Sequence, residues 1–140
     1  MTASTIVVDS SAILAILLNE PERTCFIAAL DESADACCSA VTFVEAFMVA
    51  MNRVPGFSLE RHAALIDSFG IRRLPVDEDQ STLSARAFLR FGKGRHPAKL
   101  NLGDCFSYAL AKSLDAPLLY KGEDFSRTDI VSALAAGARP

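Results

Sequence analysis

The stretch Ile6-Val7-Val8-Asp9-Ser10-Ser11, which runs straight into the apolar run from Ala12 to Leu18, decides the fold. Its first three residues are β-branched and apolar, which predicts a short buried strand. Asp9 and the two serines favour turns and helix N-termini, and the run that follows favours a helix. The chain is therefore expected to pass from a strand through a tight turn into a helix.

The same alternation of strand and helix continues along the chain. Further strands are expected at residues 36–39, 71–74 and 116–120, with a last strand or edge segment at 128–134. Helices are expected at residues 21–30, 42–51, 58–69, from 75–79 to about 90, and 102–114. Short apolar strands between longer helices predict an α/β fold, a three-layer sandwich with a mainly parallel central sheet flanked by helices. The whole chain, 1–140, is expected to form a single domain with a frayed tail at 135–140.

The composition is that of a globular chain without a strong overall charge. Of 140 residues, 51% are apolar and 22% are charged, and 17 acidic against 14 basic side chains give a formal charge of −3. These values exclude a disordered chain and give no bulk attraction to a polyanion. No apolar run approaches the roughly 18 residues of a membrane span, and no basic segment precedes Asp9 as in a secretory signal. We expect a cytoplasmic protein without a membrane partner.

Three apolar segments each contain one charged residue. They are Asp9 within 6–19, Glu45 within 37–52 and Asp104 within 100–111. A buried carboxylate without a partner is costly to ionise, so it raises its pKa, finds hydrogen-bond donors or a cation, or binds a metal ion. Each of the three follows a strand or opens a helix, and such positions form the ligand-binding edge of a parallel sheet. The pattern predicts a carboxylate cluster at that edge.

Helix capping offers a local explanation for the same three residues. Thr42 and Glu45 have the spacing of a capping box, and so do Asn101 and Asp104. Asp9 has the position of a cap or turn residue before its helix. The residues alone leave both interpretations open.

The residue types limit the chemistry of such a cluster. The four cysteines form no Cys-x-x-Cys pair and the two histidines lie far apart, so a zinc site is disfavoured and reduced core thiols are expected. Carboxylate oxygens instead suit Mg²⁺ or Mn²⁺. Because such an ion activates water and neutralises charge on a phosphodiester, the cluster predicts phosphoryl chemistry.

Four blocks of the sequence resemble the PIN-domain ribonucleases, and among them the VapC-type toxins of type II toxin–antitoxin (VapBC) pairs. The blocks are Ile6 to Ala12, Ser39 to Glu45, Leu100 to Cys105 with Tyr108 and Ala109, and Leu118 to Phe125. Their order and spacing cover nearly the whole chain. The resemblance implies a PIN domain that acts as a metal-dependent endoribonuclease.

The resemblance also implies a set of site residues. Asp9, Glu45 and Asp104 correspond to the acidic site of the family for Mg²⁺ or Mn²⁺, with Asp9 and Asp104 as direct ligands and Glu45 binding directly or through water. Relatives usually carry a fourth acid after the last strand, where this chain has Gly122. We expect Asp124 to replace it, binding the metal ion directly or through water.

Other polar residues are expected to support this site. Glu123 and Asp129 are second choices for the fourth acid. Ser11 is expected to hydrogen-bond a ligand carboxylate or a metal-bound water, although plain helix capping explains it equally well. A basic stretch without acids contains Arg86, Arg90, Lys93, Arg95 and Lys99. It is expected to hold RNA phosphates, unless it is an ordinary solvated helix end.

Three partners follow from the resemblance. The substrate is expected to be single-stranded RNA, from tRNA, rRNA or mRNA, cleaved by a water that Mg²⁺ or Mn²⁺ activates. A VapB-type antitoxin is expected to cover an apolar groove near the first helices and to obstruct the acidic site. A homodimer is also expected, with the apolar helices at 12–18 and 42–51 serving as core or interface.

Two other functions compete with this one. Phosphatases with an aspartyl nucleophile also place an Asp after the first strand, but they usually carry a second Asp two positions later, where this chain has Ser11. The alternative is a catalytically weak PIN-like domain, RNA-binding or regulatory, whose carboxylates are structural. The imperfect position of the fourth acid keeps that alternative open.

Overall fold

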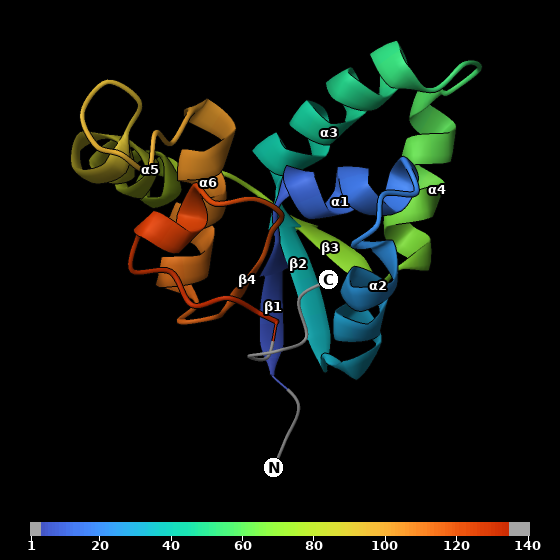
Figure 1. Cartoon of the computed structure of the whole chain (residues 1–140), viewed down its shortest axis with the longest axis horizontal. Coiled ribbons are helices and arrows are strands. Elements are labelled where there is room, and N and C mark those ends of the chain that lie inside the picture. The colour runs from blue at the N-terminus through green and yellow to red at the C-terminus, as the bar shows by residue number, and fades with distance from the viewer. Residues whose placement is uncertain (1–3, 135–140) are drawn as a thin grey trace.

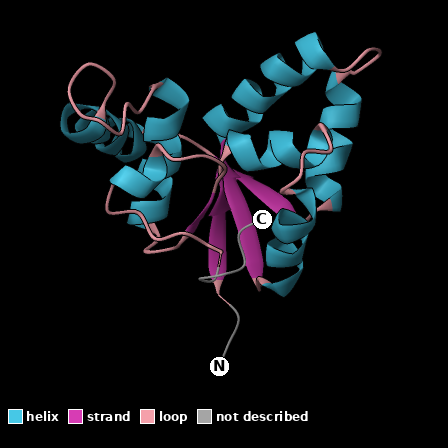
Figure 2. Cartoon of the chain, in the orientation of Figure 1, coloured by secondary structure: helices cyan, strands magenta, loops and turns pink. Residues whose placement is uncertain are grey.

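Four short parallel strands form the centre of the described chain, which comprises residues 4–134 of a computed structural model. The elements are β1 (Thr5–Val8), α1 (Ser10–Leu17), α2 (Arg23–Glu32), β2 (Asp35–Ser39), α3 (Ala40–Arg53), α4 (Leu59–Ser68), β3 (Ile71–Leu74), α5 (Glu78–Phe91), α6 (Leu102–Ser113), β4 (Leu118–Leu119) and a 3₁₀ helix at Phe125–Arg127. Figure 1 shows α1 to α4 on one side of the sheet and α5 and α6 on the other, and Figure 2 shows the same layers by element type. The predicted three-layer α/β sandwich is confirmed. Within residues 4–134, no helix has both the length and the apolar character of a membrane span.

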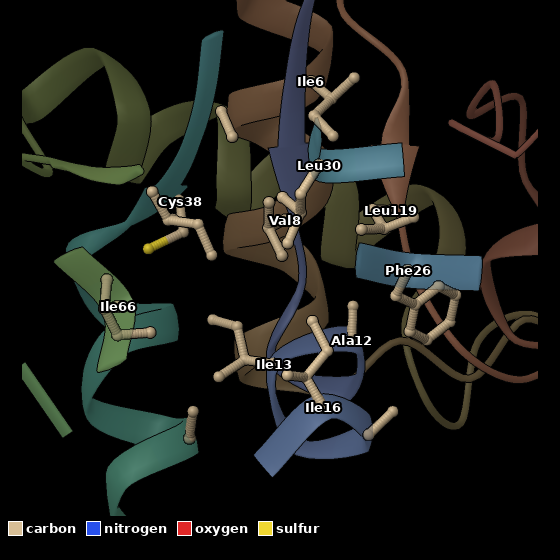
Figure 3. Packing of buried hydrophobic residues seen from close by; sticks show 14 of the residues in the cluster. Ile6, Val8, Ala12, Ile13, Ile16, Phe26, Leu30, Cys38, Ile66 and Leu119 are labelled. Carbon is tan, nitrogen blue, oxygen red and sulfur yellow. The ribbon is translucent and has the colours of Figure 1, made fainter. Parts of the chain in front are cut away.

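Alternation along the strands builds a core on each face of the sheet. Ile6 and Val8 of β1 pack among α1 to α4, in the cluster drawn in Figure 3. Val7, between them, packs on the other face against α5 and α6. The adjacent Cys37 and Cys38 divide in the same way between the two cores. Burial raises the pKa of Cys37 to about 11 and that of Cys38 to about 12, as suits the reduced core thiols expected from the sequence.

The strand order brings the ends of β1 and β4 together. The order is β3-β2-β1-β4, and Val7 lies opposite Cys37 on one side while Val8 lies opposite Leu119 on the other. The chain therefore adds β2 and β3 on one side of β1, and β4 on the other side. Such a reversal marks the ligand-binding edge at the carboxyl ends of the strands, here called the crevice. Asp9 stands at this point, and its backbone N–H donates to the carbonyl oxygen of Leu119 at 2.9 Å.

The start of α3 differs from the predicted one. The helix begins at Ala40 because Ser39, at the end of β2, accepts a hydrogen bond from the Val41 N–H at 3.1 Å. The capping box predicted for Thr42 and Glu45 is therefore wrong, and Glu45 lies in the second turn of the helix. Helix α2 begins at Arg23, later than the expected residue 21, whereas α5 begins at Glu78, within the expected range 75–79.

The strands near the carboxyl terminus are shorter than expected. The strand predicted at 116–120 is reduced to the two residues of β4. The segment 128–134 forms a single bridge, from Ser132 to β4, so it is an edge segment and not a strand. The tail predicted at 135–140 lies outside the described residues.

Helix α4 fixes the position of α3, which carries Glu45. His62 of α4 is fully buried, and its Nε2 lies 2.9 Å from the carbonyl oxygen of Phe43 in α3. The rings of Phe43, Phe47 and Phe57 surround the imidazole at centroid distances of 4.5 to 5.7 Å. Burial lowers the pKa of His62, so a neutral imidazole donates to Phe43 and ties α4 to α3.

Candidate active site

Asp9 is the most deeply buried acid of the crevice. It caps α1, and its Oδ2 accepts hydrogen bonds from the N–H and the hydroxyl of Ser11 at 3.0 and 2.7 Å. Its Oδ1 accepts from the hydroxyl of Ser107 in α6 at 2.5 Å. The Ser11 oxygen in turn accepts from the Lys121 N–H, just after β4, at 3.0 Å. Ser11 therefore contacts the expected carboxylate and also joins it to the segment that contains the expected fourth acid, Asp124.

Glu45 reaches the crevice from α3. The Ser10 hydroxyl donates to its Oε1 at 2.6 Å. Its carboxylate lies directly against Gly103 in the first turn of α6, where a Cβ atom would collide with all three carboxyl atoms. The position of Glu45 therefore depends on a residue without a side chain in a neighbouring helix.

Asp104 reaches the crevice from the first turn of α6. Its carboxylate accepts from the Asn101 N–H at 3.0 Å, and the Asn101 side chain accepts from the Asp104 N–H at 2.9 Å. The capping box predicted here is confirmed, and so is the capping position of Asp9. Asp9 and Asp104 therefore cap their helices and also belong to the predicted carboxylate cluster.

Charge repulsion links the four predicted acids. Burial, followed by the negative charges of Asp9, Glu45 and Asp124, raises the pKa of Asp104 to about 7 against the opposing hydrogen bond from the Asn101 N–H. The pKa of Glu45 is raised by burial and by the charge of Asp9. Among residues 4–134, no lysine or arginine forms an ion pair with any of these acids. The charges of Asp9, Glu45 and Asp124 thus all act on Asp104.

The two other choices for the fourth acid have different surroundings. Asp129 accepts from the Tyr108 hydroxyl and from Lys112 at 2.5 and 3.1 Å, and these hydrogen bonds hold its pKa below the ordinary value. Glu123 accepts from Ser126 in its own turn. Asp124, whose charge acts on Asp104, is the one whose field reaches the cluster.

The donor atoms of the cluster suit a hard divalent cation. All are carboxylate or hydroxyl oxygens, and the mutual repulsion is of the kind that a cation would relieve. The side chains are not arranged as a finished metal site, since within the described residues no three of the Asp, Glu, His and Cys groups converge on one point. The carboxylate of Asp104 is held toward the Asn101 backbone, so a metal ion would have to draw it inward.

Three hydroxyl residues of the site were not predicted from the sequence. Ser10 holds Glu45, Ser107 holds Asp9, and Thr42 lies behind Ser107 with its Oγ1 3.3 Å from the Ser107 oxygen. One signal was present, because Ser107 lies three residues after Asp104 and so shares its helix face. Nothing local identifies the partner of Thr42 or of Ser10.

The basic stretch lies on the surface. All five of its side chains are exposed: Arg86, Arg90, Lys93, Arg95 and Lys99. Arg90 pairs with Asp129, and Arg95 donates to the carbonyl oxygen of Leu89. Within residues 4–134, no ion pair joins them to Asp9, Glu45, Asp104 or Asp124, and a role in holding phosphates stays a prediction.

An exposed apolar surface, here called the apolar patch, borders the acids. It consists of Val44 and Met48 of α3, Phe88 and Leu89 of α5, and Leu102 of α6. One cavity of about 840 Å³ is lined by Val44, Met48, Leu102 and Glu45, and a second, of about 540 Å³, shares Leu102 and is lined by Phe88 and Leu89. The outer face of α3 is thus surface, whereas α1 is mostly buried in the core.

Comparison with known proteins gives consistent matches over most of the chain. The PIN domain model matches residues 6–131. Ribonuclease VapC42 of Mycobacterium tuberculosis is 40% identical over 125 residues, which are 89% of this chain and 95% of that protein. Ribonuclease VapC30 of the same species is 40% identical over 131 residues, 90% of this chain and 96% of that protein.

Solved structures with a similar fold share less sequence. Mycobacterium tuberculosis VapC20, described as a sarcin–ricin loop cleaving toxin, superposes with a TM-score of 0.75 at 17% identity, covering 93% of this chain and 99% of that chain. A toxin–antitoxin complex from Klebsiella pneumoniae superposes with a TM-score of 0.67 at 15% identity, covering 91% and 97%. These two similarities support the fold.

Because the pKa of Asp104 is raised, replacing this acid by a neutral residue should increase the free energy of unfolding, and the increase should depend on pH. An acid whose pKa is raised in the folded state costs stability as the pH rises from its unfolded value, near 4, to about 7. In EDTA, Asp104→Asn should therefore exceed the wild type in free energy of unfolding at pH 8 by about 2 kcal/mol, allowing for screening. The Asn side chain retains the acceptor for the Asn101 N–H. Urea unfolding between pH 4 and 8 measures the difference, which should grow up to about pH 7 and then stay constant.

The exposed Asp31 supplies the control for this measurement. Asp31→Asn, which removes a carboxylate outside the cluster, should not reproduce the gain of about 2 kcal/mol at pH 8. An Asp104→Asn variant that is less stable than the wild type at pH 8 would contradict the predicted repulsion.

Replacing Gly103 should move the Glu45 carboxylate without lowering the free energy of unfolding. Ala favours a helix over Gly by up to about 1 kcal/mol, and the atoms that a Cβ would meet are the movable end of Glu45. Gly103→Ala should keep or raise the free energy of unfolding, while it displaces the Glu45 carboxylate and weakens Mn²⁺ binding about 10-fold. Urea unfolding and calorimetric titration with Mn²⁺ measure both effects. In a Glu45→Ala background, the same substitution should cause no further loss of Mn²⁺ affinity, and an undiminished affinity in Gly103→Ala alone would refute the prediction.

Proposed function

Because the chain is a PIN domain and belongs to the family of VapC ribonucleases, we propose that it is a metal-dependent endoribonuclease toxin that cleaves single-stranded RNA. The observation that carries this proposal is the mutual repulsion of Asp9, Glu45 and Asp104 at the carboxyl edge of a parallel sheet, with raised pKa values for Glu45 and Asp104 and no ion pair to a lysine or arginine of residues 4–134. Carboxylates that repel one another and lack a cation are suited to a divalent ion. Mg²⁺ or Mn²⁺ is the ion proposed.

The residues of the crevice have distinct tasks in this proposal. When bound, the metal ion would supply an activated water and neutralise charge on the phosphodiester. Asp9 and Asp104 would hold it, with Glu45 and Asp124 binding directly or through water. Ser11 keeps the Asp9 carboxylate in place through two hydrogen bonds. Asp104 must lose the proton of its carboxyl group before it can act as a ligand, since the pKa of that group is about 7.

A VapB-type antitoxin is the proposed protein partner. The solved structures of similar fold include a toxin–antitoxin complex from Klebsiella pneumoniae. An antitoxin that covers the crevice would block access of RNA to Asp9 and Asp104, so activity is to be measured on the antitoxin-free chain. The proposed compartment is the cytoplasm, where the RNA substrates are found.

A homodimer is proposed to form through the apolar patch. Leu102, at its centre, is 74% exposed, and Met48 is 62% exposed. Contiguous exposed apolar surface of this kind marks interaction sites. Since the first cavity is also lined by Glu45, a second copy seated there would place the two crevices next to each other.

Cleavage of RNA by the antitoxin-free chain tests the function. A single-stranded RNA oligonucleotide should be cut in Mn²⁺ or Mg²⁺ and remain intact in EDTA. Asp9→Asn and Asp104→Asn should each reduce the rate by more than about 100-fold, because each removes a proposed metal ligand. Gel analysis of labelled RNA measures the rate, and calorimetry with Mn²⁺ measures binding.

Adjacent acids after β4 provide the matched control for this experiment. Asp124→Asn should slow cleavage, whereas Glu123→Gln should leave it near the wild-type rate. Cleavage that survives both EDTA and Asp104→Asn would exclude the metal mechanism. No cleavage with any metal and no bound Mn²⁺ would favour the RNA-binding or regulatory domain instead.

The mass of the purified chain tests the dimer. Light scattering should give a dimer for the wild type and a monomer for Leu102→Lys and Met48→Lys, because each inserts a charge into the centre of the apolar patch. Val131, which is 67% exposed but outside the patch, supplies the control, and Val131→Lys should stay dimeric. A monomeric wild type, or a dimeric Leu102→Lys, would contradict the interface.

A further inference from the structure

A buried chain of three polar groups links two helix layers to the end of β1. Thr42 of α3 and Ser107 of α6 have no exposed surface, and Asp9 is 2% exposed. The Thr42 and Ser107 oxygens lie 3.3 Å apart, and the Ser107 hydroxyl donates to Asp9 Oδ1 at 2.5 Å. Nothing in the local sequence connects these residues, which come from three separate elements.

The direction of the hydrogen bonds follows from the number of protons. Ser107 has one hydroxyl proton, and it goes to Asp9, since an ionised carboxylate accepts only. Thr42 must then donate to the Ser107 oxygen. The hydrogen bond that Ser107 accepts from Thr42 polarises the Ser107 hydroxyl. It therefore strengthens the hydrogen bond that Ser107 donates to Asp9.

The hydrogen bonds to the Asp9 carboxylate leave one of its acceptor positions open. Asp9 Oδ2 accepts two hydrogen bonds from Ser11, which fill its two lone pairs. Oδ1 accepts one, from Ser107, and retains one further position. Ser11 alone would leave the carboxylate able to turn about its bond to Cβ, and the contact on Oδ1 removes that freedom.

A second serine shows that the contact of Ser107 is not the usual one for a helix. Ser84 of α5 is also buried, at 4% exposure, and its hydroxyl donates to the carbonyl oxygen of Gln80, one turn back in its own helix. This local bond is the common arrangement for a serine within a helix. Ser107 instead donates across the domain to an acid 98 residues away.

We propose that Ser107 is a positioning residue that acts through Asp9, with Thr42 as the donor behind it. It fixes the plane of the Asp9 carboxylate and leaves one position on Oδ1 for a divalent cation. This inference rests on the proposed function for its effect on metal binding, but the orientation of Asp9 can be tested without metal.

The experiment compares Ser107→Ala with Ser84→Ala in the antitoxin-free chain. Ser107→Ala should weaken Mn²⁺ binding in calorimetry by about 10- to 100-fold and lower kcat for RNA, with KM for RNA unchanged. Ser84→Ala removes a buried hydroxyl of the same kind and should keep the wild-type Mn²⁺ affinity. Ser107→Thr, which keeps the hydroxyl, should recover affinity relative to Ser107→Ala. Wild-type Mn²⁺ affinity in a folded Ser107→Ala, or equal losses in both alanine variants, would overturn the proposal.

Thr42→Val keeps the test decisive if Ser107→Ala does not fold. It preserves shape and removes only the outer donor, so a few-fold loss of Mn²⁺ affinity is expected, and an unchanged affinity would overturn the proposal. A crystal structure of Ser107→Ala in EDTA should have the Asp9 carboxylate rotated, and an unmoved carboxylate would equally overturn it. If the wild type neither binds Mn²⁺ nor cleaves RNA, the proposed function fails, while a rotated Asp9 would still support the positioning role.

Discussion

The rest of the structure depends on one constraint, the burial of the Asp9 carboxylate at the end of β1, where an ionised group is costly unless donors surround it. The chain meets this constraint with the N–H and hydroxyl of Ser11 and the hydroxyl of Ser107. Ser11 belongs to α1 and Ser107 to α6, which cover opposite faces of the sheet (Figure 1). Satisfying one carboxylate therefore joins both helix layers at the strand end.

Hydroxyl donors have a different consequence from a cationic partner. They satisfy the oxygens of Asp9 but leave its charge, which then acts on Glu45 and Asp104. A lysine is close in the fold, because the Lys121 N–H donates to Ser11, but the Lys121 ammonium group is held by Glu20 and Glu22 at 3.2 and 3.4 Å. The retained repulsion disfavours the ionised, metal-free cluster, so the cation of the proposed function would stabilise the folded chain more than it would beside a paired acid.

Features that depend on neighbours along the chain were predictable from the sequence, and features that depend on distant contacts were not. The strand and helix alternation predicted the three layers, and isolation in apolar segments singled out Asp9, Glu45 and Asp104. The capping box at Thr42 was wrong because the end of β2 decides where α3 begins, and that end is set by pairing with β3, where Ser39 lies opposite Leu74. The position of Ser107 on the helix face of Asp104 was readable from the sequence, but its contact with Asp9 was not, since that partner is brought near only by the folded sheet.

In the sequence, helix capping and a carboxylate cluster are alternative explanations for Asp9 and Asp104. In the fold, the same two carboxylates do both. Each carboxylate lies at a helix N-terminus, where the partial positive charge of the helix offsets part of the repulsion between the acids. Glu45, in the second turn of α3, has no such support. Its carboxylate is held by Ser10 and by the space that Gly103 leaves open. The acid least constrained by its own helix is therefore the one whose position is determined by two other helices, α1 and α6.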